Sequence, residues 1–194
     1  MVGILAVQGA FAEHAQMLDR LGAAHTCIRQ KRDLSGIERL ILPGGESTTQ
    51  RRLLCDLGLL VPIRERIAGG MPVMGTCAGL ILLADEVADE DMCLGGLPVR
   101  VRRNAYGRQL GSFSAAGEIG RIKDYPMRFI RAPYVENVLR SDVQILNVTD
   151  GRITAVQYKH ILGLAFHPEL TEDDRLHRYF MSLCSWYTAP DEDA

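Results

Sequence analysis

Several features are missing from this 194-residue sequence, and each absence excludes a class of protein. No stretch approaches the roughly 18 uninterrupted apolar residues that a membrane-spanning helix needs. The short apolar run Val2 to Val7 has no basic leader and gives way to Gln8, unlike a signal peptide. Neither sign of charge dominates, since 22 Lys and Arg face 24 Asp and Glu. We therefore expect a soluble protein whose partners are small molecules or proteins, with no nucleic acid and no membrane among them.

Cysteine is scarce and irregularly spaced. The five cysteines are odd in number and include no C-x-x-C pair: Cys27, Cys55, Cys77, Cys93 and Cys184. Such a set argues against a disulfide framework and against a zinc knuckle. We expect a cytoplasmic protein without a metal site.

Length and composition favour one domain. At about 150 residues per domain the chain has room for one, and its 47% of apolar residues can form a core without disulfide or metal staples. No internal repeat or low-complexity linker divides it. We predict a single domain over residues 1–188 and an acidic, frayed tail over 189–194.

The first half of the sequence alternates short apolar runs with segments of helical periodicity. Strands are predicted at Gly3 to Val7, Arg39 to Leu42 and Val73 to Thr76, and helices at Ala10 to Leu21, Thr48 to Leu57 and Val61 to Ala68. Each strand ends in a turn that contains glycine. This alternation is typical of a parallel α/β sheet.

The second half changes to strand-like stretches separated by turn residues. Strands are predicted at Pro98 to Arg102, Met127 to Arg131, Val143 to Val148, Ile153 to Tyr158 and Ile161 to Phe166. Asp150-Gly151 predicts a hairpin turn, and a last helix is expected to begin after Thr171 and to run to about Trp186. The predicted fold is therefore an α/β domain with a mostly parallel central sheet and a partly antiparallel second half.

The run Gly75-Thr76-Cys77-Ala78-Gly79 is the most informative motif. G-x-C-x-G between a strand and a helix is the thiol counterpart of the G-x-S-x-G nucleophile elbow. The glycines let strand and helix approach closely, so that Cys77 can hold a strained backbone and project into a cleft. The helix start favours the thiolate form, which predicts a nucleophile. The alternative is that Cys77 is a small buried apolar residue, as most free cysteines are.

His167 is the best placed base for such a thiol. It follows an apolar run, in the segment Ala165-Phe166-His167-Pro168-Glu169. In an extended chain residues two apart share a face, so Glu169 can accept the second imidazole proton and orient the ring toward Cys77. The remaining histidines have no acid two places on and are interpreted as ordinary surface or core residues: His14, His25, His160 and His177.

The loop from Leu42 to Thr49 joins a strand end, Gly44-Gly45 and a polar helix start. Adjacent glycines let backbone amides turn toward an anionic oxygen, so the loop is a candidate oxyanion hole. It can also be an ordinary capped turn with Ser47 or Thr48 as N-cap. No Gly-Lys-Ser/Thr follows, which excludes a phosphate-binding P-loop.

Together and in this order, the three motifs resemble the class I glutamine amidotransferases. The resemblance extends from Val2 to about Leu183 and narrows at Gln8-Gly9-Ala10, Glu13-His14, residues 103–109 and residues 129–133. These segments are similar to those of the glutaminase subunits of pyridoxal 5′-phosphate synthases.

The resemblance implies a flavodoxin-like fold, a catalytic triad and no cofactor. The triad would be Cys77, His167 and Glu169, the oxyanion hole would involve Gly45 and Ala78, and glutamine would be bound by Gly45, Glu46, Ser47, Arg103, Ile130 and Arg131. Two arginines and a glutamate suit the α-carboxylate and α-ammonium of glutamine, although without the resemblance both arginines would be interpreted as solvated surface charges.

The resemblance also implies a partner. Ammonium is a poor nucleophile, so a glutaminase must pass ammonia directly to an acceptor, here a (β/α)₈ barrel synthase subunit in a hetero-oligomer. The Gly44-Gly45 peptide suggests an oxyanion hole that is complete only when the partner docks. Two other readings stay open: another cysteine hydrolase such as a γ-glutamyl hydrolase, and a non-catalytic glutamine-sensing subunit.

Overall fold

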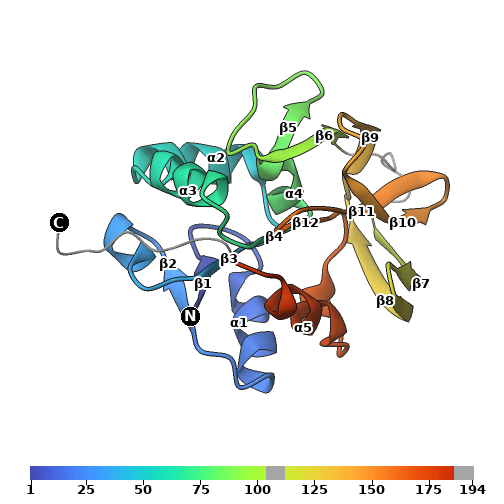
Figure 1. Cartoon of the computed structure of the whole chain (residues 1–194), viewed down its shortest axis with the longest axis horizontal. Helices are drawn as coiled ribbons and strands as arrows, with labels where there is room; N and C mark the ends of the chain where they lie inside the picture. Colours follow the sequence, from blue (N-terminus) through green and yellow to red (C-terminus); the bar gives the residue numbers. More distant parts are fainter. Residues whose placement is uncertain (104–111, 186–194) are drawn as a thin grey trace.

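A large, mostly parallel sheet crosses the middle of the computed structural model, which describes residues 1–103 and 112–185 (Figure 1). Its parallel half has the strand order β2-β1-β3-β4-β12. The bounds are β1 Val2–Leu5, β2 His25–Ile28, β3 Arg39–Leu42, β4 Val73–Thr76 and β12 Ile161–Leu164. This is the 2-1-3-4-5 order of the flavodoxin-like doubly wound sheet, so the predicted fold class is confirmed.

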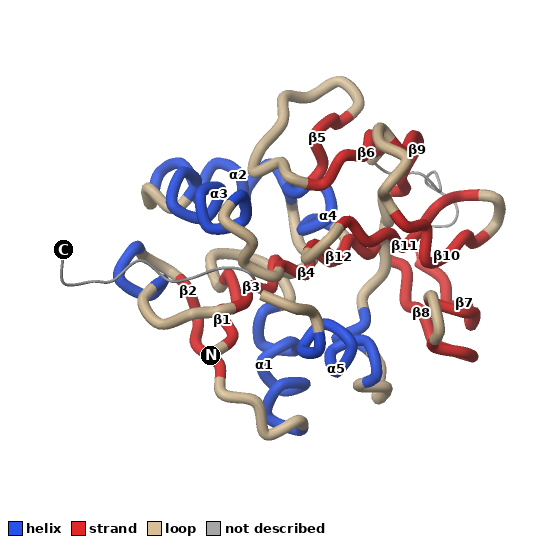
Figure 2. The backbone as a smooth tube through the Cα atoms, viewed as in Figure 1, coloured by secondary structure: helices blue, strands red, loops and turns tan. Residues whose placement is uncertain are grey.

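Beyond β12 the sheet continues through strands that pair antiparallel, except for the parallel pair β5–β6 at its edge. From β12 the order is β11-β9-β6-β5, with β10 paired to β11. The bounds are β5 Ala84–Val87, β6 Leu97–Arg102, β9 Tyr134–Val138, β10 Gln144–Thr149 and β11 Arg152–Tyr158. The predicted turn between β10 and β11 is present, with positive φ at both Asp150 and Gly151. A separate hairpin of β7 Ser112–Ile119 and β8 Ile122–Ile130 lies beside this half (Figure 2).

Helices cover both faces of the parallel half and make three layers (Figure 1). One layer contains α1 Phe11–Arg20 and α5 Arg175–Ser182; the other contains α2 Ser47–Asp56, α3 Leu60–Ala68 and α4 Ala78–Leu83. Two short 3₁₀ turns, η1 Lys31–Leu34 and η2 Pro168–Leu170, complete the elements. Since both faces are covered, every residue of β1, β4 and β12 is buried. The five cysteines are all free, as their spacing predicted.

Four strands were not predicted from the sequence, namely β2, β5, β7 and β9. Their sequences are short or polar, as in the Ser-Phe-Ser-Ala-Ala-Gly-Glu-Ile of β7, and intrinsic propensity does not mark them. The strand predicted over Met127 to Arg131 covers only the end of β8, because β8 begins at Ile122. The tail 189–194 and Trp186 lie outside the described residues.

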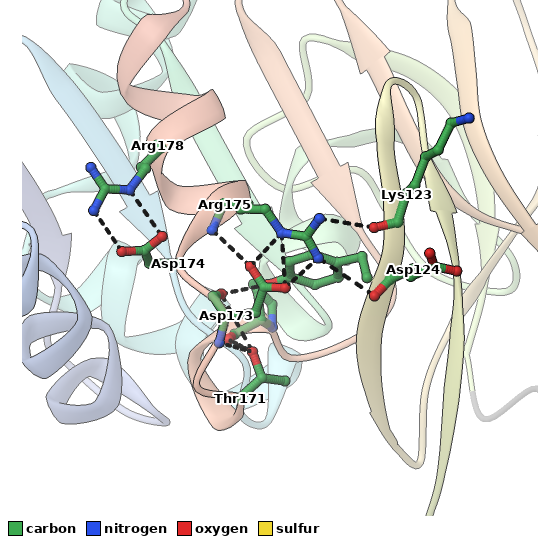
Figure 3. Close-up of polar contacts among 9 residues, drawn as sticks. Lys123, Asp124, Thr171, Asp173, Asp174, Arg175 and Arg178 are labelled. Atoms are coloured by element: carbon green, nitrogen blue, oxygen red, sulfur yellow. Dashed lines mark hydrogen bonds and ion pairs between the residues drawn. The ribbon is translucent and has the colours of Figure 1, made fainter.

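The last helix is shorter than predicted: it begins at Arg175 instead of just after Thr171 and ends at Ser182 instead of near Trp186. The intervening residues form a polar turn, in which the amide of Asp173 donates to Oγ1 of Thr171 at 3.3 Å. The Arg175 guanidinium then bridges the Asp173 carboxylate and the Lys123 carbonyl, both at 2.9 Å, in the turn region of β8 (Figure 3). This contact ties the segment after β12 to the β7–β8 hairpin.

The junction of β3, β4 and α4 depends on two close backbone approaches. A Cβ on Gly79 would lie 2.0 Å from the Leu42 carbonyl oxygen, and one on Gly75 would lie 2.6 Å from the carbonyl carbon and oxygen of Gly79. Because backbone atoms cannot move aside as a side chain can, only glycine fits at either position. The prediction that these glycines permit a tight elbow is confirmed.

We expect Gly79→Ala to lower the free energy of unfolding by about 3 kcal/mol, the upper end of the usual cost of overpacking. The matched control is Gly117→Ala, where a Cβ meets only side-chain ends at 3.3 Å and 3.4 Å, and a change of about 1 kcal/mol or less is expected. Urea unfolding of both variants measures the difference. Equal stabilities would contradict this account of the elbow.

Candidate active site

The predicted site residues meet at the carboxyl ends of β1, β3, β4 and β12. All of them except Glu169 and Ala78 line a cavity of about 270 Å³, close to the lower end of the usual range of ligand pockets, about 300–1,000 Å³. The lining residues are Gln8, Gly45, Glu46, Ser47, Cys77, Ile81, Arg103, Ile130, Arg131, Pro133 and His167. This volume suits a ligand the size of one amino acid.

Cys77 occupies a strained turn between β4 and α4. Its backbone has φ 48° and ψ −99°, a left-handed conformation that residues other than glycine rarely adopt. The conformation is fixed by the bond from its amide to the Leu164 carbonyl, at 2.8 Å. The residue is only 7% exposed but lines the cavity, with Sγ 3.9 Å from the Ile130 carbonyl oxygen. A thiol sealed in the apolar core would not reach this cavity.

His167 and Glu169 form a buried pair beside the thiol. Nδ1 of His167 lies 2.7 Å from Oε1 of Glu169, so this nitrogen carries the proton and Nε2 is left for the cavity. The expected extended geometry is wrong: Pro168 begins the 3₁₀ turn η2, and the turn brings the carboxylate back onto the imidazole. The amide of His167 donates to the Arg128 carbonyl of β8 at 2.8 Å.

Electrostatic contacts favour the charged forms of both groups. Burial opposes protonation of His167, but hydrogen bonds with Cys77 and Glu169 outweigh it and raise the pKa of His167 to about 10. Burial likewise opposes ionisation of Glu169, while His14 and His167 lower the pKa of this carboxyl. The site is therefore set up to hold an imidazolium at His167 against a carboxylate at Glu169.

The Gly44-Gly45 loop rests on the imidazole and on the start of α1. A Cβ on Gly44 would lie 2.2 Å from Cε1 of His167, so the glycine is needed for this contact. The Gly44 carbonyl accepts from the amide of Ala10 at 2.9 Å, and the amide of Glu46 donates to Oε1 of Gln8 at 2.9 Å. The loop is thus held by the residues that follow β1.

Glu46, not Ser47 or Thr48, is the N-cap of α2, and its side chain makes no capping bond. The capped-turn interpretation named the wrong residue. Ser47 is the first helical residue; its Oγ is buried and has no hydrogen-bond partner among the described residues. A hydroxyl without a partner beside a cavity is available to a ligand.

Arg103 lies between two carboxylates at one side of the cavity. Its guanidinium contacts Oε1 of Glu46 at 2.7 Å and also bonds to Glu90. Arg131 has φ 42° and an exposed side chain. The remainder of the motif that begins at Arg103, residues 104–109, lies outside the described residues.

Four further residues of the site had no predicted role: Gln8, Ile81, Pro133 and Glu90. Gln8 had a usable signal, since it follows a strand in the same way as Gly44 and Cys77 do. Glu90 had none, because it reaches Arg103 only through the folding of the β5–β6 connection.

The fold is that of a glutamine amidotransferase. A solved structure described as a glutamine amidotransferase matches with a TM-score of 0.89 and 43% identity, over 94% of this chain and 97% of that one. The PurLQS structure from Thermotoga maritima shares the fold, with a TM-score of 0.62 at 18% identity over 93% of this chain and 96% of that one.

The chain belongs to the SNO glutamine amidotransferase family, whose pattern matches residues 4–185. It is 53% identical to "Pyridoxal 5'-phosphate synthase subunit PdxT" of Desulfitobacterium hafniense (strain DSM 10664 / DCB-2), over 95% of this chain and 93% of the relative. It is 51% identical to the protein of the same name from Bifidobacterium longum (strain NCC 2705), over 94% of this chain and the whole relative.

In residues 1–103 and 112–185 no helix has the length and apolar character needed to cross a membrane. Within the same ranges, no three His, Cys, Asp or Glu side chains are grouped as metal ligands.

We expect Glu169→Gln to lower the pKa of His167 from about 10 toward its ordinary value of 6.5, because the anionic hydrogen-bond acceptor is lost. A raised pKa means that protonated His167 stabilises the fold below about pH 6.5 and that this contribution is lost as the pH rises through about 10. Titration of the imidazole by NMR measures the pKa, and the exposed Glu172→Gln is the control. The same pKa in Glu169→Gln and in the unmodified protein would contradict the assignment.

Proposed function

We propose that this chain is the glutaminase subunit of a pyridoxal 5′-phosphate synthase: it hydrolyses L-glutamine to glutamate and ammonia, and a synthase subunit consumes the ammonia. The observation that carries the proposal is the strained Cys77 beside the His167–Glu169 pair, at the edge of a cavity of amino-acid size. Family membership and the relatives named above support the choice of glutamine and of the partner.

The first half of the reaction forms a thioester. The Cys77 thiolate attacks the side-chain carbonyl carbon of glutamine and forms a C–S bond. His167 gives its Nε2 proton to the departing nitrogen, the C–N bond breaks, and ammonia leaves. Glu169 holds the ring by its 2.7 Å bond to Nδ1 and stabilises the imidazolium before the transfer.

The second half hydrolyses the thioester. His167, now neutral, removes a proton from water as the oxygen attacks the carbonyl carbon. The C–S bond then breaks, which releases glutamate and regenerates the thiolate and the imidazolium. In both halves the oxyanion would accept hydrogen bonds from the amides of Ala78, at the start of α4, and Gly45; each such donor is typically worth about 10²- to 10³-fold in rate.

Recognition of glutamine follows from the charges around the cavity. Arg103 and Arg131 offer guanidinium groups to the α-carboxylate, and Glu46 together with the Ile130 carbonyl can accept from the α-ammonium. In this proposal the glutamine carboxylate competes with Glu46 for Arg103, which Glu90 continues to hold. The Ser47 hydroxyl supplies a further neutral contact.

The partner is a synthase subunit, expected to be a (β/α)₈ barrel. Ammonia that escapes into water is protonated and becomes a poor nucleophile, so direct transfer to the synthase is required. Docking near the start of α1 would act on the loop that forms the oxyanion hole, because Gln8 and Ala10 hold that loop.

We expect Cys77→Ala to reduce ammonia release from L-glutamine by about 10⁴-fold or more, since the nucleophile is lost. Cys55→Ala, at an exposed thiol, is the control and should keep full activity. A coupled glutamate dehydrogenase assay measures the rates, and γ-glutamyl peptides are tested in parallel. Cleavage of the peptides in preference to glutamine would support a γ-glutamyl hydrolase instead.

The glutaminase rate should rise by at least about tenfold when the synthase subunit is added, if docking completes an oxyanion hole that lacks one donor in the free chain. Pyridoxal phosphate should form from glutamine, a pentose phosphate and a triose phosphate, as followed by its absorbance. Equal rates with and without the partner would reject control by docking, and full glutamine-dependent synthesis with Cys77→Ala would favour a non-catalytic glutamine-sensing subunit.

A further inference from the structure

A second buried polar cluster lies directly behind the Glu169 carboxylate. It consists of His14 from α1, Thr76 from the end of β4 and His177 from α5, none of which has any exposed surface. Nε2 of His14 lies 3.4 Å from Oε2 of Glu169 and 3.3 Å from Oγ1 of Thr76, while Nδ1 of His14 lies 3.0 Å from Nε2 of His177. The two helices lie on the same face of the sheet (Figure 1).

The His14 ring is neutral near pH 7. Its burial lowers its pKa, which outweighs the opposite effect of Glu169. Of the other charged groups around it, His167 opposes protonation and Glu13 favours it. His14 therefore acts on the carboxylate through an N–H group and not through a full charge.

The His177 ring is neutral as well. Burial, followed by the repulsion from His14, lowers the pKa of His177 to about 3. Glu169 and Asp174 act in the opposite direction, and Arg20 adds to the lowering. Two neutral imidazoles in contact share one hydrogen bond, in which one ring donates and the other accepts.

The position of the carboxylate decides which ring donates. Since Oε2 of Glu169 faces Nε2 of His14, the favourable tautomer has the proton on that nitrogen, and Nδ1 of His14 then accepts from Nε2–H of His177. The other tautomer would place a lone pair of His14 against the carboxylate. It would also leave an N–H at Nδ1 of His177, a buried atom without a hydrogen-bond partner among the described residues.

We propose that His14 and His177 are positioning residues for the reaction, a relay of two neutral imidazoles that fixes the free oxygen of Glu169. Oε2 makes no hydrogen bond in the described part of the chain. Nε2 of His14, at 3.4 Å, is the N–H group placed to hold it when the site is formed for reaction, so His14 is the group that can stop the carboxylate from turning. Oε1 is thereby held on His167, and His167 on the Cys77 thiolate. The kinetic experiments described next rest on the proposed function, whereas the NMR experiment does not.

The first experiment compares His14→Met with His14→Gln in the complex with the synthase subunit. The two side chains have similar length, but only glutamine has an N–H to offer Glu169. Loss of a partner behind a catalytic ligand costs about 10–100-fold in metal sites, and we expect His14→Met to lose at least tenfold in kcat with KM for glutamine within about twofold. His14→Gln should recover most of the loss.

The second experiment uses the chain alone and needs no turnover. The proton between His167 and Glu169 should give a far-downfield NMR resonance, because a short bond to a carboxylate deshields it. This resonance should broaden or disappear in His14→Met and persist in His14→Gln. If the unmodified protein shows the resonance but releases no ammonia even with the synthase subunit, the proposed function fails while the relay still stands.

The third experiment tests whether the relay is linear. His177→Leu alone should lower kcat less than His14→Met, and the double variant should lose no more than His14→Met alone. The control is His160→Met, at a buried histidine that bonds to the Ile67 carbonyl far from the cavity, and it should change stability only. Unchanged kcat and an unchanged resonance in His14→Met, or equal losses in His14→Met and His14→Gln at equal stability, would overturn the proposal.

Discussion

The site depends on one steric constraint: α4 approaches β3 so closely that the residue at the contact can carry only a hydrogen atom in place of a side chain. Gly79 lies against the Leu42 carbonyl, and this contact sets the direction in which α4 leaves the sheet. The left-handed backbone of Cys77 follows from that direction, since the chain must turn sharply between β4 and a helix pressed onto its neighbour. The strain at Cys77 is stabilised by the burial of the whole elbow, in which β4 and α4 are covered on all sides.

The second constraint is the buried carboxylate of Glu169. The free energy lost when this group is removed from water explains the polar residues around it. An ionised group without exposed surface needs hydrogen bonds to both oxygens, because it has lost those of water. His167 meets Oε1, and the helices α1 and α5 bring His14 and His177 toward Oε2. Apolar side chains would pack between these two helices better than a pair of histidines. The adjacent negative charge of Glu169 explains why polar side chains lie there.

The sequence predicted the parallel half of the fold well, because its strands are continuous apolar runs that end in glycine turns. It also predicted that Cys77, His167 and Glu169 lie together, since each has a local motif. Polar strands such as β7 were not predicted, because they form through pairing with a neighbouring strand and not through the strand propensity of their residues. His14 and His177 were interpreted as ordinary residues for a similar reason: each is an unremarkable helical histidine until two distant segments fold against Glu169. Functional residues in a turn can be recognised from the motif around them. Residues that support them from other helices or strands have no local motif, so a single sequence does not identify them.

The β7–β8 hairpin gives the cavity a wall that does not belong to the main sheet. Its end brings the Ile130 carbonyl to the thiol, and the Arg128 carbonyl holds the backbone of His167. The sheet that carries Cys77 and the hairpin that holds the backbone of His167 are therefore distinct structural units, joined through contacts such as the Arg175 bridge. Stability and chemistry can consequently change separately in this architecture: substitutions in the hairpin can retune the reacting groups while the folded core stays as it is.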